Sequence, residues 1–220
     1  MTHRYYCNQP LAVNTTIELS KEEQRHLKSV MRTKKGDKIE IVNGKGYLAF
    51  GEYHDGITIT NVTYQDPDSA QKYLALGLSE PKHLEMIIEK GTELGVDEFI
   101  IFPSKKSKYK VLSSNKIERL HKILLSSLKQ SKRLYLPKIT LLTKKEDLSK
   151  NQNYLLADFE GKTFKSPSVS TVFIVGPESG FTEDEITFFK EDLKAHSVVL
   201  SKNVLRCETA AICAATLLSI

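Results

Sequence analysis

Alternating apolar and polar positions dominate the first third of the chain. Short runs that favour β-strands are separated by turn residues such as Asn43 and Gly44, a pattern typical of a small barrel. Ser20 followed by Glu23 matches a capping box, which predicts one short helix over residues 21–31. We expect strands at residues 4–7, 16–19, 38–43, 46–54 and 57–64.

After a polar linker at residues 65–72, the pattern changes to strands that alternate with helices. One helix is predicted to open at Pro81 and to stop at Gly95, with apolar residues along one face. Further strands are expected at 73–78, 98–103, 138–143, 153–160, 172–175 and 197–201, and further helices at 115–130, near 146–149, after Thr182 and at 207–219. This alternation predicts an α/β fold with a parallel sheet covered on both faces.

The strand at residues 172–175 ends abruptly in the sequence GPESG, residues 176–180. Ligands of open parallel sheets bind beyond the carboxyl ends of the strands, where this loop is delivered. Gly176 and Gly180 lack a Cβ, so the backbone can turn sharply and a flat ligand can approach it closely. The loop lacks the spacing of the usual phosphate-binding signatures, so a cradled phosphate is not expected. On its own, such a turn can also be purely structural.

The sequence LSKNVLRCETA, residues 200–210, leads from the last strand into an almost wholly apolar terminal helix. Arg206 and Glu208 at the mouth of a buried helix would be costly to bury unless they pair or face a ligand. Alternatively, Glu208 favours the helix dipole and Arg206 pairs with a surface carboxylate. The residues alone leave both interpretations open.

The positive charge of the chain is concentrated in its middle. Lys and Arg against Asp and Glu number 9 and 9 in residues 1–69, 17 and 9 in residues 70–150, and 6 and 9 in residues 151–220. A basic block favours a polyanionic partner such as RNA. The alternative is a solvated lysine-rich surface.

Cysteine and histidine positions show no metal-binding spacing. Cys7, Cys207 and Cys213 form neither a disulfide framework nor a CxxC pair, so we expect a reducing compartment and no structural metal. No signal peptide is recognisable, and no stretch reaches the roughly 18 uninterrupted apolar residues of a membrane helix. We expect a soluble, cytoplasmic protein with no membrane partner.

Several stretches together resemble one known family. The combination of IVGPESGFTEDEI and LSKNVLRCETA, preceded by MIIEKGTELGVDEFIIFPSKKS and LKQSKRLYLPKI, resembles the ribosomal RNA small subunit methyltransferase E family. The segments HRYYC and HLKSVMRTKKGDKIEIVNG also look like its N-terminal domain, so the resemblance extends over nearly the whole chain.

The resemblance implies an S-adenosylmethionine-dependent enzyme of the SPOUT class that methylates N3 of one uridine in 16S ribosomal RNA of the small subunit. It implies a PUA-like β-barrel that binds RNA over residues 1–68. It also implies an α/β methyltransferase domain over residues 72–220, whose C-terminal segment forms a trefoil knot. Family members work as homodimers, so a homodimer is expected.

The resemblance also assigns candidate residues to the cofactor and to the reaction. Arg206 would steady negative charge on the uracil or hold the target phosphate, and Glu178 or Glu208 would orient the base or assist proton removal. The implied cofactor-binding residues are Val175, Gly176, Pro177, Gly180, Leu200, Ser201, Val204 and Leu205.

RNA contacts are expected in the basic block and in the barrel. Phosphate contacts there would position the RNA without reading its sequence. The candidates are Lys105, Lys106 and Lys108 in a strand-end loop, Gln130, Ser131 and Arg133 in a segment that usually reads Glu-Gln-Ser-x-Arg in the family, and Arg4 and Arg32 in the barrel.

Two positions depart from the family pattern. The loop usually reads GPEGG, and Ser179 replaces its first paired glycine, which is tolerable only if the position does not need a positive φ. The acidic residue that usually precedes Gln130 is Lys129 here, a charge reversal.

Two other functions remain open from the sequence. A knotted methyltransferase could act on a different RNA position, because the cofactor site would be shared and the RNA target would not. A catalytically silent RNA-binding factor of ribosome assembly could have kept the fold and lost the reaction.

Overall fold

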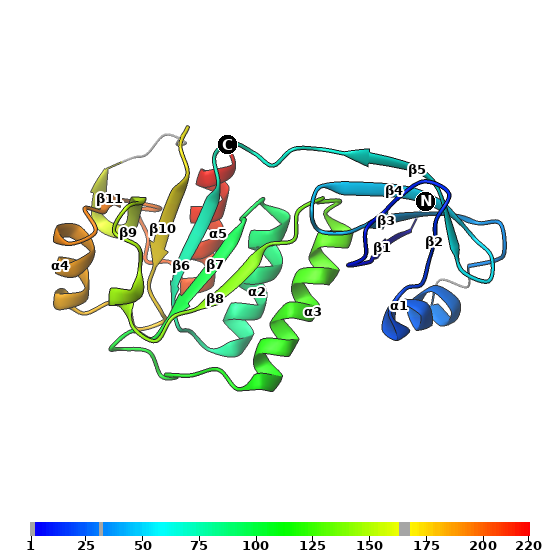
Figure 1. The fold of residues 1–220 in the computed structure, drawn as a ribbon. Coiled ribbons are helices and arrows are strands. Elements are labelled where there is room, and N and C mark those ends of the chain that lie inside the picture. The colour runs from blue at the N-terminus through cyan, green and yellow to red at the C-terminus, as the bar shows by residue number, and fades with distance from the viewer. Residues whose placement is uncertain (1–2, 31–32, 163–167) are drawn as a thin grey trace. The chain divides into compact units, whose positions relative to one another are not determined.

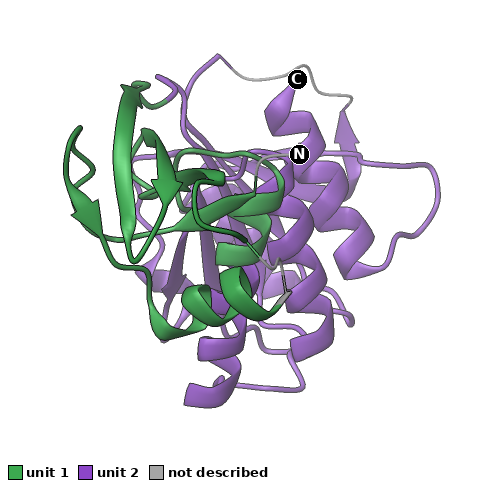
Figure 2. Ribbon diagram, turned by 90° about the vertical axis from the view of Figure 1, so that its right-hand side faces the viewer, with its two compact units in different colours: residues 1–67, 125–136 green, residues 68–124, 137–220 purple. Residues whose placement is uncertain are grey.

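The structure, a computed structural model, describes residues 3–30, 33–162 and 168–220 of the 220-residue chain. The chain forms two compact units, which we call unit 1 (residues 1–67 and 125–136) and unit 2 (residues 68–124 and 137–220) (Figure 2). The return of residues 125–136 to unit 1 is a feature that the sequence pattern did not indicate.

Unit 1 is built around a five-stranded mixed sheet (Figure 1). In spatial order its strands are β1 (Arg4–Tyr6), β3 (Lys38–Val42), β4 (Tyr47–Tyr53), β5 (Ile57–Tyr64) and β2 (Thr16–Ile17). β1 runs parallel to β3, and the other neighbours are antiparallel. Alternate side chains such as Tyr5, Ile39, Ile41 and Ile59 form the core, as the period-two pattern predicts. The predicted strands are confirmed, with β1 and β2 shorter than expected.

The predicted helix of unit 1 begins where the capping residues place it. The Ser20 hydroxyl accepts a hydrogen bond from the Glu23 N–H at 3.2 Å, which satisfies one free donor at the start of the helix. Helix α1 (Lys21–Arg25) then continues as a π-helical turn, η1 (His26–Val30). The last predicted residue of this helix, Met31, lies outside the described residues.

Unit 2 contains a six-stranded sheet in which every paired neighbour is parallel. The spatial order is β11 (His196–Val198), β9 (Asn153–Lys162), β10 (Thr171–Val175), β6 (Lys72–Gly77), β7 (Glu98–Phe102) and β8 (Lys138–Leu141). All five residues of β10 are buried, as expected of a central parallel strand covered on both faces.

Helices cover both faces of this sheet (Figure 1). Helices α2 (Pro81–Glu93) and α5 (Cys207–Ser219) contact each other, and α5 lies on β6 and β10. Helix α4 (Glu183–Glu191) packs through Phe189 against the alternate side chains of the strands, including Val172 and Ile174. The predicted α/β fold is therefore confirmed.

The remaining helical segments connect these elements. Helix α3 (Ser114–Gln130) begins in unit 2 and ends in unit 1, and a short 3₁₀ turn, η2 (Lys145–Asp147), follows β8. Among the described helices, none is long and apolar enough to cross a membrane.

Candidate active site

A cavity of about 420 Å³ lies at the carboxyl end of β10 and beside the middle of β9 in unit 2. Its walls come mainly from residues 156–159, 175–181 and 199–205, with contributions from the first turns of α4 and α5. Small-molecule sites typically enclose about 300–1,000 Å³ and lie beyond the carboxyl ends of parallel strands. The volume and the position both suit a ligand of nucleoside size.

The structure places all eight residues predicted to bind a cofactor in the lining of this one cavity. They are Val175, Gly176, Pro177 and Gly180 on one side and Leu200, Ser201, Val204 and Leu205 on the other. The lining residues that sequence reasoning missed include 156–159, in the middle of β9. The strand itself was predicted, but nothing in the pattern says that it lies beside β10.

Backbone geometry explains the glycine spacing of the GPESG loop. Gly180 has φ +66°, a left-handed conformation that favours glycine, and a Cβ there would meet no atom within 4 Å. Ser179 is not among the described non-glycine residues with positive φ, so serine fits where the family usually has glycine. A Cβ on Gly77, at the end of β6, would lie 2.5 Å from the Pro177 ring, so the strand end packs closely against the loop.

Glu178 joins the loop to the start of α2. Its Oε1 accepts a hydrogen bond from the Glu80 N–H at 2.7 Å and contacts Nδ1 of His83 at 2.6 Å. Burial alone raises the pKa of Glu178, but the hydrogen bonds from Glu80 and His83 outweigh it and hold the pKa below its usual value. Glu178 therefore presents an ionised carboxylate at the cavity wall.

The three residues Arg206, Cys207 and Glu208 at the start of α5 differ in their exposure to solvent. Arg206 is the N-cap residue and is exposed, whereas Cys207 and Glu208 are buried. Burial raises the pKa of the Cys207 thiol to about 12, helped by the hydrogen bond that Cys207 Sγ donates to Glu208 at 3.3 Å. Of the two interpretations that the sequence left open, burial applies to Glu208 alone, which lies in the first turn of α5, whereas Arg206 is exposed.

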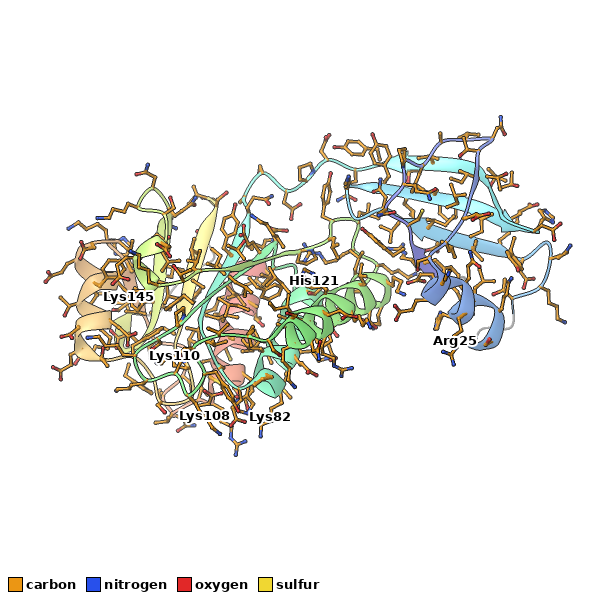
Figure 3. The ribbon with its side chains drawn as sticks, turned by 60° about the horizontal axis from the view of Figure 1, so that its bottom comes forward. Arg25, Lys82, Lys108, Lys110, His121 and Lys145 are labelled. Carbon is orange, nitrogen blue, oxygen red and sulfur yellow. The ribbon has the colours of Figure 1, made fainter. Side chains whose placement is uncertain are left out.

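The predicted lysines contact the loops around the cavity. Lys105 pairs with Asp184 at 2.6 Å, Lys106 donates to the Phe181 carbonyl at 3.0 Å, and Lys108 pairs with Glu80 at 3.2 Å. Lys82 also contacts Glu80, and Figure 3 shows Lys82, Lys108 and Lys110 on the same side of unit 2.

Buried Glu185 holds this lysine loop against α4. Its carboxylate accepts hydrogen bonds from the backbone N–H of Lys105 at 2.8 Å, from the Ser104 hydroxyl at 3.2 Å and from the backbone N–H of Thr182 at 2.9 Å. Thr182 in return accepts from the Glu185 N–H, which completes a capping box. One carboxylate thus fixes two of the loops at the carboxyl edge of the sheet.

Most of the candidate RNA-binding residues of unit 1 are less exposed to solvent than the lysines of unit 2. Arg4 is mostly buried and forms a two-point ion pair with Glu40, at 3.0 and 2.9 Å. The Ser131 hydroxyl donates to the Ser127 carbonyl, and Gln130 is exposed at the end of α3. The Arg133 carbonyl accepts a hydrogen bond from Arg4. Arg32 lies outside the described residues.

Lys129, where the family usually carries an acidic residue, forms an ion pair with Glu23 of α1. The pair is largely buried, since the side chains of Lys129 and Glu23 keep only 21% and 11% of their exposure. The charge reversal is therefore compensated inside unit 1.

Comparison with known families matches both parts of the chain. The family described as RNA methyltransferase domain matches residues 66–219, and the family described as RNA methyltransferase PUA domain matches residues 19–56.

Comparison with curated proteins finds similar relatives over nearly the full length. The Ribosomal RNA small subunit methyltransferase E of Rickettsia conorii is 31% identical, over 96% of this chain and 93% of its own. The protein of the same name from Bacillus subtilis is 29% identical, over 93% of this chain and 90% of its own.

Among solved structures, a Ribosomal RNA small subunit methyltransferase E from Neisseria gonorrhoeae is similar in fold, with a TM-score of 0.87 and 25% identity. The match covers 98% of this chain and 95% of that chain, which was crystallised bound to S-adenosyl methionine. A probable rRNA-methyltransferase from Porphyromonas gingivalis, 20% identical with a TM-score of 0.82, has the same fold.

Proposed function

The chain belongs to the ribosomal RNA small subunit methyltransferase E family of RNA methyltransferases, and we propose that it transfers a methyl group from S-adenosylmethionine to N3 of one uridine in 16S ribosomal RNA. The observation that carries this proposal is the cavity at the carboxyl edge of unit 2, which both family loops line together.

The residues of the cavity suit this cofactor. The Cβ position of Gly180 faces open space, so a side chain there would occupy room that a flat adenine needs. Val175, Leu200 and Leu205 supply apolar walls. Bound there, S-adenosylmethionine would supply an electrophilic methyl group on a sulfonium.

The chain itself would position the base and manage its charge. Uracil N3 must lose its proton to become nucleophilic, and both hydrogen bonds to the Glu178 carboxylate end on Oε1, which leaves Oε2 as the acceptor that we assign to the N3–H. The exposed guanidinium of Arg206 would neutralise the negative charge left on the uracil oxygens or hold the adjacent phosphate. Glu208 is assigned a supporting role at the helix start.

RNA binding would use both units. We propose the barrel, residues 1–68, as an RNA-binding domain and residues 72–220 as the methyltransferase domain. Lys105, Lys106 and Lys108 are exposed in the loop after β7 and lie at the carboxyl edge of the sheet. Gln130, Ser131, Arg133 and Arg4 are assigned weaker, supporting contacts.

A homodimer and a C-terminal trefoil knot complete the proposal. Phe159 and Val204 line the cavity yet are 67% and 84% exposed, which leaves apolar surface at its rim for a second copy to cover. A ribosomal substrate would place the protein in the cytoplasm.

The test is methyl transfer from labelled S-adenosylmethionine to small ribosomal subunits that lack the modification, with the product nucleoside identified by mass spectrometry. We expect 3-methyluridine. A different methylated nucleoside would assign another RNA position. Cofactor binding without transfer would move the target to another RNA, and the loss of both would favour a catalytically silent assembly factor.

A further inference from the structure

Three side chains with different metal-binding donors converge beside the cavity. They are His83 of α2, Glu178 of the GPESG loop and Cys207, the first residue of α5, and one ligand atom from each lies within 4.8 Å of the others. Nδ1 of His83 is 2.6 Å from Glu178 Oε1 and 3.8 Å from Cys207 Sγ. Among the described residues this is the one such group.

From these contacts we propose that His83, Glu178 and Cys207 form a binding site for one divalent cation of the Zn²⁺ class. The site shares Glu178 with the proposed methyl transfer, which itself needs no metal: the cation would take Oε1, which faces His83, and leave Oε2 for the N3–H. It joins three segments that are distant in the sequence, which is why no ligand spacing was visible there.

The distances suit a tetrahedral ion. Zn²⁺ binds imidazole nitrogen at about 2.0–2.1 Å and thiolate sulfur at about 2.3 Å, which sets these two donors roughly 3.5 Å apart. The observed separation of Nδ1 and Sγ is 3.8 Å. The closer contact of His83 with Glu178 is a hydrogen bond, and a cation would open it by taking the place of the shared proton.

The chemical types of the three ligands indicate which class of cation would bind. One thiolate, one imidazole and one carboxylate suit Zn²⁺ and other late first-row ions, whereas Mg²⁺ and Ca²⁺ prefer oxygen ligands alone. Three protein ligands also leave a fourth position for water or for Glu208, whose Oε2 lies 3.3 Å from Cys207 Sγ.

The charges around the thiol favour a cation. One carboxylate oxygen of Glu178 lies within 4.8 Å of Cys207 Sγ, and Glu208 Oε2 lies 3.3 Å from it, so a bound cation would be close to two carboxylates. When the cation binds, the S–H bond of Cys207 breaks, a metal–sulfur bond forms, and the thiol proton is released to solvent. The proton between His83 and Glu178 leaves Nδ1 for Nε2 of the imidazole or for solvent, which frees Nδ1 to bind the cation. In the bound state, the positive charge of the cation would balance the negative charges of the thiolate and of the two carboxylates.

To test the proposal, the full chain is stripped of metal with a chelator and titrated with Co²⁺. Co²⁺ binds in the same kind of site as Zn²⁺, and its absorption spectrum reports its ligands. We expect one Co²⁺ per chain and a thiolate-to-cobalt charge-transfer band that added Zn²⁺ removes. Cys207→Ser should abolish the band. Cys213→Ser is the matched control, because Cys213 lies on the same helix outside this cluster, and it should leave the band unchanged.

A second variant keeps the test decisive if Cys207→Ser fails to fold. His83→Gln removes one ligand from a partly exposed position and should weaken Co²⁺ binding at least tenfold while circular dichroism shows a folded chain. Zn²⁺ should raise the Tm of the unsubstituted chain and lose this effect in His83→Gln. No charge-transfer band in the unsubstituted chain, or Co²⁺ affinity unaffected by His83→Gln, would overturn the proposal.

Discussion

At the scale of single residues, Gly180 combines two requirements that substitution can separate. Its φ of +66° disfavours any residue with a Cβ, and it lines the cavity with no atom within 4 Å of its Cβ position. Asparagine tolerates the left-handed conformation better than other residues, whereas valine does not. Gly180→Asn therefore tests the cavity, and Gly180→Val tests the cavity and the backbone together.

We expect Gly180→Asn to stay folded and to bind S-adenosylmethionine at least tenfold more weakly, a loss of about 1.4 kcal/mol. Gly180→Val should lose the same affinity and, in addition, about 1–3 kcal/mol of stability from backbone strain. Isothermal titration calorimetry and urea unfolding measure the two effects. Unchanged affinity in Gly180→Asn would show that the ligand does not use this wall.

Arg206 offers a second test at the residue scale. Because the side chain is exposed and lies outside the cavity lining, Arg206→Ala should leave cofactor affinity within about twofold and slow single-turnover methylation roughly 10²-fold or more. Arg206→Lys keeps the charge but not the planar pair of donors, so a partial rescue would separate charge from geometry. A normal single-turnover rate in Arg206→Ala would remove this residue from the reaction.

At the scale of elements, Glu185 is the contact that fixes the loop after β7 to the start of α4. Glu185→Ala would leave the buried Ser104 hydroxyl and the partly buried N–H groups of Lys105 and Thr182 without their acceptor, at a cost of about 1–3 kcal/mol in the free energy of unfolding. Exposed Glu183, in the same turn, is the control, and Glu183→Ala should change stability by less than about 0.5 kcal/mol. Equal effects in urea unfolding would contradict this assignment.

The same carboxylate predicts a pH dependence. Burial raises the pKa of Glu185, but hydrogen bonds from Thr182, Lys105 and Ser104 outweigh it, so the pKa lies below 4.5 in the folded chain. Its stabilisation is therefore complete above pH 4.5 and is lost as the pH falls through the lowered pKa. The stability difference between the unsubstituted chain and Glu185→Gln should shrink in acid, and a difference that is constant from neutral pH down to pH 3 would contradict it.

At the scale of the whole molecule, the lysines at the carboxyl edge of unit 2 should attract RNA phosphates. Replacing Lys105, Lys106 and Lys108 by Ala should reduce the slope of log affinity for RNA against log salt by roughly 2. Lys72, Lys138 and Lys150 precede or start strands at the opposite edge of the sheet, so their joint replacement is the matched control. Equal slopes for the two triple variants would place the RNA elsewhere.

The sequence predicted the elements well because their signals are local. Pro81, Thr182 and Cys207 mark helix starts that the structure confirms, and the apolar run at 172–175 is the buried strand β10. The environment of Arg206 and the partners of Glu178 were not predictable, because they depend on how distant segments meet. Strand order has the same origin, so the contribution of residues 156–159 to the cavity had no sequence signal.

The ion pair between Lys129 and Glu23 limits how this protein can be recombined with its relatives. Unit 1 is made of two separate segments of chain, and the pair joins one to the other. A chimera that carried only residues 1–67 into a relative with glutamate at the position of Lys129 would bring two carboxylates together in a largely buried place. Residues 1–67 and 125–136 must therefore be transferred together, because residues 1–67 alone lack the partner of Glu23.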